Sequence, residues 1–208
     1  MYSETVFQEI INAWHAMSGW EMLAFVLALA YLLLAMKERV ECWYMALGST
    51  SIYAVIFWDV ELLLMSVLQI YYLMMAIYGW SQWGKPSDNK PILSIHRWSW
   101  RRHSLVISSG LLAMLAVAYL LQINTSAEPS TLLYVEALTT CGAVVATFMV
   151  ARKVLENWLY WIVIDALTVY LCVKTGLYLS GILFAVYVVL ATLGFFQWQR
   201  RYQKQILL

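Results

Sequence analysis

Long apolar stretches alternate with short polar breaks along the whole chain, and this pattern predicts an all-α membrane protein. Each stretch has the roughly 17–25 residues that a helix needs to cross a bilayer. Several breaks are only a few residues long, so consecutive spans must be tight antiparallel neighbours, and 81–103 is the one substantial loop. We predict seven transmembrane helices, near residues 21–36, 42–58, 62–80, 104–122, 132–151, 155–173 and 176–198.

The last three spans repeat the first three at a fixed offset of 115 residues. Identical pairs at this offset are Trp43 and Trp158, Tyr72 and Tyr187, Ala76 and Ala191, Gly79 and Gly194, and Trp83 and Trp198. Two three-span units in direct series would insert with opposite orientations, but the single span at 104–122 turns the second unit back. This 3+1+3 plan of parallel repeats is typical of SWEET-like transporters, whose substrate site lies between the halves near the bilayer midplane.

The same pattern divides the chain into four segments. Residues 1–18 are predicted to form an amphipathic helix at the outer interface, with Ser3 as its N-cap. The first three-helix repeat follows at 19–83, and a cytoplasmic loop and linker helix occupy 84–123. The second repeat and a basic tail occupy 124–208.

Composition and charge support a membrane location and give an orientation. The chain is 63% hydrophobic and 12% charged, with a mean hydropathy of +0.70. A soluble domain of this size could not cover so much apolar surface. The predicted topology puts twelve of the 13 Lys and Arg residues on one side and Lys174 alone on the other. Because basic residues stay on the cytoplasmic side, we expect the N-terminus outside and the C-terminus in the cytoplasm.

Asp165 is the clearest candidate for chemistry, because it falls near the middle of the sixth span. A carboxylate there costs several kcal/mol (about 2.5–3.5 on insertion scales) unless it is paired or hydrated. Helical spacing places it on one face with Trp158, Trp161 and Thr168. Such a carboxylate between two indoles would suit an aromatic organic cation. The alternative is that Asp165 hydrogen-bonds Thr or Tyr hydroxyls of a neighbouring helix and only locks the bundle.

Other candidate substrate-binding residues lie on the spans that should face the cavity between the repeats. They are Trp43, Ser49, Thr50, Tyr53, Gln69, Tyr72 and Tyr187. Thr50 aligns with Asp165, so the two repeats differ where charge matters. Glu136 begins the fifth span. It is either a gate or an attractor for cations at the outer mouth of the cavity, or a solvated charge with neither role. For Trp83 and Trp198, at the cytoplasmic ends of their spans, a packing or interfacial role is favoured.

Catalysis, metal binding and nucleic-acid binding have little support in the sequence. His15, His96 and His103 lie outside or at the edges of spans, so we predict no intramembrane metal site and no cofactor. No second midplane acid accompanies Asp165, and no nucleotide-binding glycine loop occurs, so we predict that the chain is not an enzyme. The basic run 97–102, with its tryptophans, is better explained as a positive-inside anchor than as a nucleic-acid contact.

Two sequence motifs resemble the Pnu family of vitamin transporters. They are ARKVLENWLYW at 151–161, followed by Gly-Leu-Tyr at 176–178, and IYGWSQW at 77–83. The resemblance covers nearly the whole chain, including the 3+1+3 topology. It implies a multi-pass protein of the bacterial inner membrane that moves a vitamin by facilitated diffusion. It also implies a cytoplasmic kinase as metabolic partner, which traps the product by phosphorylation. Whether the chain forms a homo-oligomer is left open by the sequence.

Departures from this family indicate the cargo. Nicotinamide riboside members typically have asparagines where this chain has Ser49, Ala76 and Asp165. This chain lacks the three amides of those members and has an acid in place of one of them. The difference favours thiamine, whose thiazolium ring is cationic, so the chain most resembles the thiamine branch. We therefore predict an inner-membrane thiamine transporter. Nicotinamide riboside, also a ring cation, is the alternative within the family, and a non-transporting membrane scaffold is a more distant one.

Overall fold

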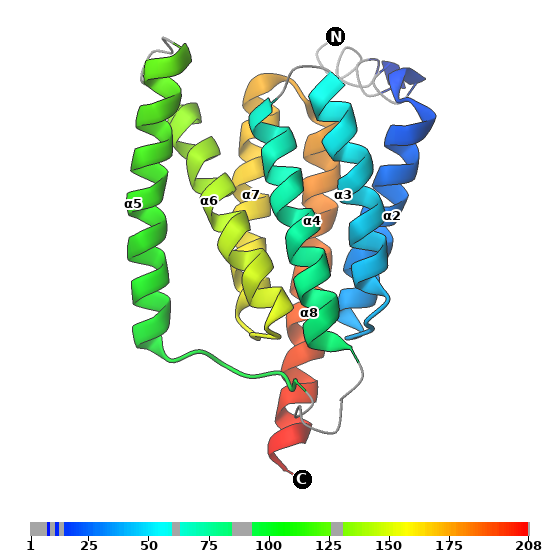
Figure 1. Cartoon of the computed structure of the whole chain (residues 1–208), viewed down its shortest axis with the longest axis vertical. Coiled ribbons are helices and arrows are strands. Elements are labelled where there is room, and N and C mark those ends of the chain that lie inside the picture. Colours follow the sequence, from blue (N-terminus) through cyan, green and yellow to red (C-terminus); the bar gives the residue numbers. More distant parts are fainter. Residues whose placement is uncertain are drawn as a thin grey trace.

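The structure is a computed structural model that describes residues 8, 11–12, 15–59, 63–84, 93–125 and 131–207. Apart from one isolated β-bridge between His96 and Val154, the regular structure in these ranges is helical. Seven helices cross the molecule (Figure 1): α2 Gly19–Met36, α3 Cys42–Asp59, α4 Leu63–Trp83, α5 Trp100–Thr125, α6 Thr131–Ala151, α7 Asn157–Thr175 and α8 Tyr178–Ile206.

Each predicted span corresponds to one of these helices, but several ends differ. α2 begins earlier because Ser18 and Glu21 form a capping box, with Glu21 N–H donating to Ser18 Oγ over 3.2 Å. α5 begins at Trp100 and α8 continues to Ile206, because polar and basic residues extend a helix beyond the bilayer. The helix predicted over 1–18, with Ser3 as its cap, lies almost entirely outside the described residues.

Five helices in the described part of the chain are long and apolar enough to cross a membrane: α2, α5, α6, α7 and α8. α3 and α4 have 18 and 21 residues and are similar in length to these. Several of their side chains line the central cavity described below. α3 and α4 thus contribute both to the bundle and to the wall of that cavity.

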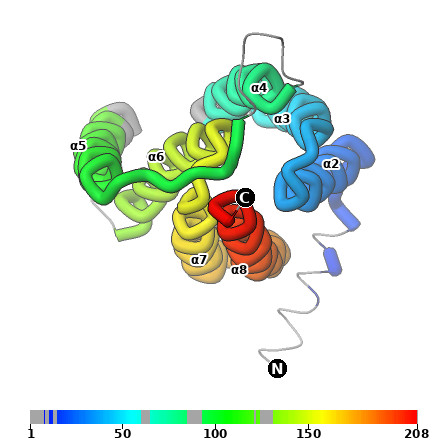
Figure 2. The backbone as a smooth tube through the Cα atoms, turned by 90° about the horizontal axis from the view of Figure 1, so that it is seen from below, coloured from blue at the N-terminus to red at the C-terminus, as the bar shows by residue number. Residues whose placement is uncertain are grey.

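Six of the helices form a ring, and α5 stands outside it (Figure 2). α3 packs between α2 and α4, and α7 packs between α6 and α8. These two three-helix units meet where α4 packs against α6 and where α2 packs against α8. The α5 backbone lies close to that of α6 alone among the described helices, and a His103–Tyr160 hydrogen bond joins the start of α5 to α7. The ring therefore has two seams, one on each side of a central space.

Basic side chains gather at one end of the bundle, the lower end in Figure 1, where α2, α4, α6 and α8 finish or extend outward. We call this the basic end. The described Lys and Arg residues there are Lys37, Arg39, Arg97, Arg101, Arg102, Arg152, Lys153, Arg200, Arg201 and Lys204. Lys174, in the last turn of α7, lies at the opposite end.

The turns that end α2 and α6 at the basic end have the same backbone conformation. Glu38 and Lys153 are the non-glycine residues of the described chain with positive φ, at 55° and 53°. The amide of the residue after each one donates to a carbonyl five residues back, Arg39 to Leu34 and Val154 to Met149. This is the Schellman arrangement, which satisfies the last carbonyls of a helix. Glu38 and Lys153 are 115 residues apart.

The same offset relates two tryptophan–glycine contacts inside the units. The Trp43 ring of α3 lies directly against Gly79 of α4, and the Trp158 ring of α7 lies against Gly194 of α8. A Cβ atom at Gly194 would fall 2.7 Å from the Trp158 ring, and one at Gly79 would fall even closer to Trp43. Each glycine is therefore required for close approach of its helix to the tryptophan.

We expect Gly194→Ala to destabilise the protein, because the new methyl group would overlap the buried Trp158 ring. Overpacking of this kind costs about 1–3 kcal/mol and should outweigh the gain of up to about 1 kcal/mol in helix propensity. The thermal unfolding midpoint in detergent should fall by a few degrees. Gly110→Ala is the matched control, since no atom lies within 4 Å of a Cβ at Gly110. An equal effect of both substitutions would contradict the packing argument.

Candidate functional site

A cavity of about 490 Å³ lies in the middle of the six-helix ring, in the range usual for small-ligand sites. Both units line it, and α5 contributes none of its walls. Ten predicted site residues are in its lining: Trp43, Ser49, Thr50, Tyr53, Gln69, Tyr72, Trp158, Trp161, Asp165 and Tyr187. The structure thus brings together side chains from α3, α4, α7 and α8 that are far apart in the sequence.

Asp165 is the acidic side chain of this cavity. It is 4% exposed and lies in the middle of α7, where the lining also contains Trp158 and Trp161 from the same helix. Tyr72 of α4 and Tyr187 of α8 line the same cavity. No described residue donates a hydrogen bond to Asp165. A buried acid in this situation is costly to ionise unless a ligand or water supplies a cation or hydrogen-bond donors.

Two hydroxyl groups of the α3 wall are already engaged as donors. Ser49 donates to the carbonyl of Ala24 in α2 over 2.9 Å, and Thr50 donates to the carbonyl of Ala46 over 2.8 Å. These hydroxyls therefore offer a ligand their oxygen lone pairs rather than a proton. Gln69 has no such internal bond among the described residues, which leaves its amide as a neutral polar group for a ligand.

Two predicted site residues lie outside this lining. Thr168 is on α7, and its hydroxyl donates to the carbonyl of Ile164 over 2.9 Å within the helix. Glu136 is exposed on α6, five residues after its start. The cavity also contains side chains that sequence reasoning missed, among them Tyr31 of α2 and Thr147 of α6.

Aromatic rings close the cavity toward the basic end. Trp43 and Trp158, in the cavity wall, pack edge-on against Trp83 and Trp198, with centroids 5.3 and 5.4 Å apart. Trp83 and Trp198 meet each other across the two units at 6.0 Å. All four rings are buried. Trp83 and Trp198 therefore have the packing role that the sequence favoured over substrate contact.

The same two tryptophans also tie the units together by hydrogen bonds. The Trp83 indole of α4 donates to the carbonyl of Ala151 at the end of α6 over 3.1 Å. The Trp198 indole of α8 donates to the carbonyl of Ala35 near the end of α2 over 3.2 Å. Each seam of the ring is thus crossed by one of these two bonds.

A charged layer covers the tryptophans on the side of the basic end. Lys153 Nζ lies 3.1 Å from Glu38 Oε2, and Arg201 Nη1 lies 2.9 Å from Glu38 Oε1. The Lys153 ammonium also lies over the Trp83 ring, 4.8 Å from its centroid. Lys153 is 8% exposed, so the ion pair is largely withdrawn from water. The rings and this layer together seal the cavity at the basic end.

Comparison with known proteins gives the family. The family model described as nicotinamide mononucleotide transporter matches residues 18–200. The nicotinamide riboside transporter PnuC of Escherichia coli (strain K12) is 24% identical over 189 residues, covering 79% of this chain and 78% of its own. The riboflavin/roseoflavin transporter RibM of Streptomyces davaonensis is 28% identical over 130 residues, covering 61% and 59%.

A solved structure has the same fold. The crystal structure of the vitamin B3 transporter PnuC superposes with a TM-score of 0.69 at 18% identity, covering 95% of this chain and 88% of its own. Together with the match of the family model to nearly the whole chain, this settles the class of protein. The chain belongs to the nicotinamide mononucleotide transporter family, the Pnu family that its motifs resemble, and is a multi-pass vitamin transporter of the bacterial inner membrane.

Proposed function

We propose that the central cavity binds one vitamin molecule that carries a cationic aromatic ring. The observation that carries this proposal is the buried carboxylate of Asp165, to which no described residue donates a hydrogen bond. A ring cation would neutralise the carboxylate and stack on the surrounding indole and phenol rings. Trp158, Trp161, Tyr72 and Tyr187 supply those rings, and Gln69 supplies a neutral hydrogen bond.

Nicotinamide riboside is the first candidate substrate. Its pyridinium ring is cationic, and the PnuC relative of E. coli is named as a transporter of this vitamin precursor. Its ribose hydroxyls could donate to the lone pairs of Ser49 and Thr50, whose own protons are engaged elsewhere. This substrate therefore suits both the charged and the neutral parts of the cavity wall.

Thiamine is the second candidate, and one observation favours it. The acid at position 165 is unpaired, and an aminopyrimidine can donate to a carboxylate while the thiazolium supplies positive charge. Against it, Ala76 is buried in the core and absent from the cavity lining, so the substitution at this position does not alter the pocket wall. One of the three departures that favoured thiamine therefore has no direct bearing on the substrate.

We also propose that α2–α4 and α6–α8 are parallel repeats that move relative to each other during transport. The matched turns at Glu38 and Lys153 and the matched contacts of Trp43 and Trp158 support this, since each pair is offset by 115 residues. The basic end is the cytoplasmic one on this proposal, because basic residues remain inside. The N-terminus then lies outside and the C-terminus in the cytoplasm.

Passive movement with metabolic trapping is the transport mode that we propose. No nucleotide-binding motif occurs in the sequence, and one buried acid suffices for charge recognition without ion coupling. A cytoplasmic kinase would hold the internal concentration of free vitamin low by phosphorylation. In liposomes that lack such a kinase, the vitamin should then equilibrate across the membrane rather than accumulate inside, and uncouplers should not alter its uptake.

Calorimetric titration of nicotinamide riboside and of thiamine into the detergent-purified protein tests the assignment. Binding of nicotinamide riboside, with weaker or no binding of thiamine, is the result we expect. The reverse would exchange the two candidates and leave the cationic-ring proposal intact. Riboflavin, whose ring is neutral, is the control compound. Tight riboflavin binding without binding of either cation would contradict the role proposed for Asp165.

A further inference from the structure

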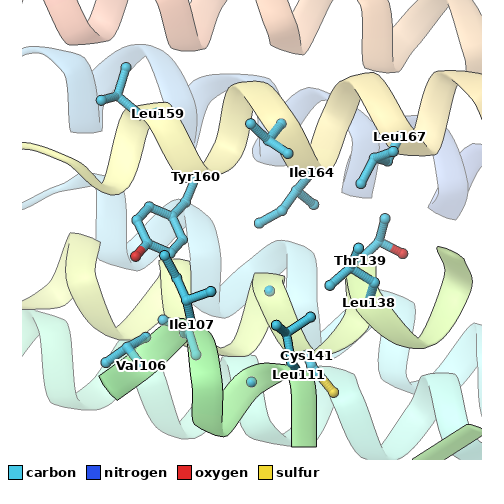
Figure 3. A pocket seen from close by; sticks show the side chains of 14 residues that line it. Val106, Ile107, Leu111, Leu138, Thr139, Cys141, Leu159, Tyr160, Ile164 and Leu167 are labelled. Atoms are coloured by element: carbon cyan, nitrogen blue, oxygen red, sulfur yellow. The ribbon is translucent and has the colours of Figure 1, made fainter. Parts of the chain in front are cut away.

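A second cavity of about 350 Å³ lies on the outer side of the bundle, between α5, α6 and α7 (Figure 3). Its walls are almost wholly apolar, and Figure 3 shows Val106 and Ile107 of α5 on one side and Ile164 and Leu167 of α7 on the other. It shares no lining residue with the central cavity. Its lining offers too few polar groups to bind a water-soluble vitamin.

The shape of this outer groove follows from how α5 is attached. At the basic end, His103 of α5 is joined to Tyr160 of α7 by a 3.0 Å hydrogen bond. Farther along, α5 packs against α6 but against no other described helix, so it stands apart from α7. Gly110 widens the groove, since no atom lies within 4 Å of a Cβ at this position. The groove is thus closed at the basic end and open farther into the membrane.

The length of the groove matches the hydrocarbon depth of one leaflet. Its α7 wall runs from Leu159 to Leu167, eight residues or about 12 Å along the helix. Half of a roughly 30 Å hydrocarbon core is about 15 Å. An acyl chain from the leaflet at the basic end would therefore lie along the groove for most of its length.

Positive charge lies at the end of the groove where the headgroup of such a lipid would sit. Arg101 and Arg102 are exposed in the first turn of α5, and no described carboxylate lies within ion-pair distance of either. Arg97 differs, because it is paired with Glu156 at 2.8 Å. Val106, where the apolar wall begins, is four residues or about 6 Å along the helix from Arg102.

We propose that the outer groove binds one acyl chain of an anionic phospholipid whose phosphate lies beside Arg101 and Arg102. The chain fills the space between α5 and α7, and the arginines select a negatively charged headgroup. The bound lipid thereby attaches the linker helix to the second three-helix unit. The occupant is a bilayer lipid of the leaflet at the basic end, and it is independent of the vitamin in the central cavity.

Native mass spectrometry of the full-length protein in detergent tests the headgroup part of this proposal. Titration with phosphatidylglycerol should give a defined 1:1 lipid adduct, at lower concentrations than phosphatidylcholine of the same chain length. Arg101→Gln/Arg102→Gln should weaken phosphatidylglycerol binding about thirtyfold, since each arginine near an anionic headgroup contributes about fivefold. It should leave phosphatidylcholine binding unchanged. Equal binding of both lipids by the unaltered protein would overturn the proposal.

A second variant tests the groove itself. Gly110→Leu places a side chain in the open space at this position, so the 1:1 adduct should be lost by at least tenfold for both lipids. The unfolding midpoint of this variant should be no lower than that of the unaltered protein, because leucine favours a helix more than glycine does. Ser108→Leu, on an exposed face of α5 outside the groove lining, is the matched control and should bind lipid normally. Unchanged binding by Gly110→Leu, or equal loss in Ser108→Leu, would refute the site.

Discussion

Replacing Asp165 by asparagine, the residue typical of nicotinamide riboside members at this position, is expected to weaken binding of thiamine by about 1–3 kcal/mol, or roughly five- to 150-fold, and to weaken binding of nicotinamide riboside less. This is the scale of a hydrogen bond or ion contact to a charged group. Asparagine keeps the size and hydrogen-bonding oxygen of the side chain but removes its charge. Because no described residue donates a hydrogen bond to the carboxylate, the substitution should break no internal contact. Calorimetric titration of the variant gives the affinity directly.

Two measurements separate loss of recognition from loss of fold in this variant. The unfolding midpoint of Asp165→Asn without substrate should equal or exceed that of the unaltered protein, since a buried charge has been removed. Glu136→Gln is the matched control, because it makes the same chemical change on an exposed acid outside the cavity. If Asp165→Asn folds and binds thiamine as tightly as the unaltered protein, the carboxylate of Asp165 has no role in recognising a cationic ring.

The alternative interpretation of Asp165, as an acid that only locks the bundle, finds no support in the contacts. That interpretation requires a Thr or Tyr hydroxyl from a neighbouring helix as donor. Thr50 and Thr147 instead donate to carbonyls of their own helices, at 2.8 and 2.7 Å. Tyr71, the tyrosine beside Tyr72, donates to the carbonyl of Val144 over 2.8 Å. These three hydroxyls thus stabilise the helices without involving the carboxylate.

Much of the helical framework could be predicted because bilayer length and apolar runs determine it directly. The wall residues of α3 and α7 could also be predicted, since helical spacing puts Trp158, Trp161 and Asp165 on one face. Tyr72 and Tyr187 were found because the same residue recurs at the same offset in both units. These signals depend only on helical periodicity and on identical residues at the 115-residue offset, so the sequence alone reveals them.

Other parts of the site depend on how the helices meet, and the sequence carries no signal for them. Tyr31 lies within a leucine-rich stretch of α2 and looks like an ordinary membrane residue, yet it lines the cavity. The proton of Ser49 is engaged by the carbonyl of Ala24, a contact between residues 25 positions apart. Thr168 shares a helix face with Asp165, but lies beyond the cavity lining. Periodicity defines a face but cannot say how far along the helix a cavity extends.

The ion pair between Glu38 and Lys153 joins equivalent positions of the two three-helix units and bears on how the protein opens during transport. Opposite charges stand at positions 115 residues apart, each at the left-handed residue of its turn. Because the two units face each other across the cavity, the matched turns meet and form a salt bridge. A movement that opens the basic end must separate this pair and the Trp83–Trp198 contact beneath it. The pair therefore favours the conformation that is sealed at the basic end.

Glu38→Gln is accordingly expected to open the basic end more often. Its side chain is 14% exposed and that of Lys153 is 11%, so removing the carboxylate leaves two cations without their counter-charge. We expect a cost of about 2–3 kcal/mol to the sealed state, below the roughly 3–5 kcal/mol for a fully buried pair. Such a cost shifts a two-state equilibrium at least thirtyfold. Arg39→Gln is the control, because its partner Glu41, whose pKa it lowers, is a solvent-exposed acid in the same turn.

Thiol labelling can distinguish this opening from unfolding. Cys42 is fully buried in the same core cluster as Trp43 and Trp83, directly inside the sealed end, whereas Cys172 is buried near the opposite end of α7. In variants that retain one of these thiols, with Cys141 and the other replaced by alanine, a maleimide reagent reports each site separately. Glu38→Gln should raise the labelling rate of Cys42 at least tenfold and leave that of Cys172 unchanged. An unchanged rate at Cys42 would exclude a gating role for the pair, and a parallel rise at both thiols would show that the substitution only loosens the fold.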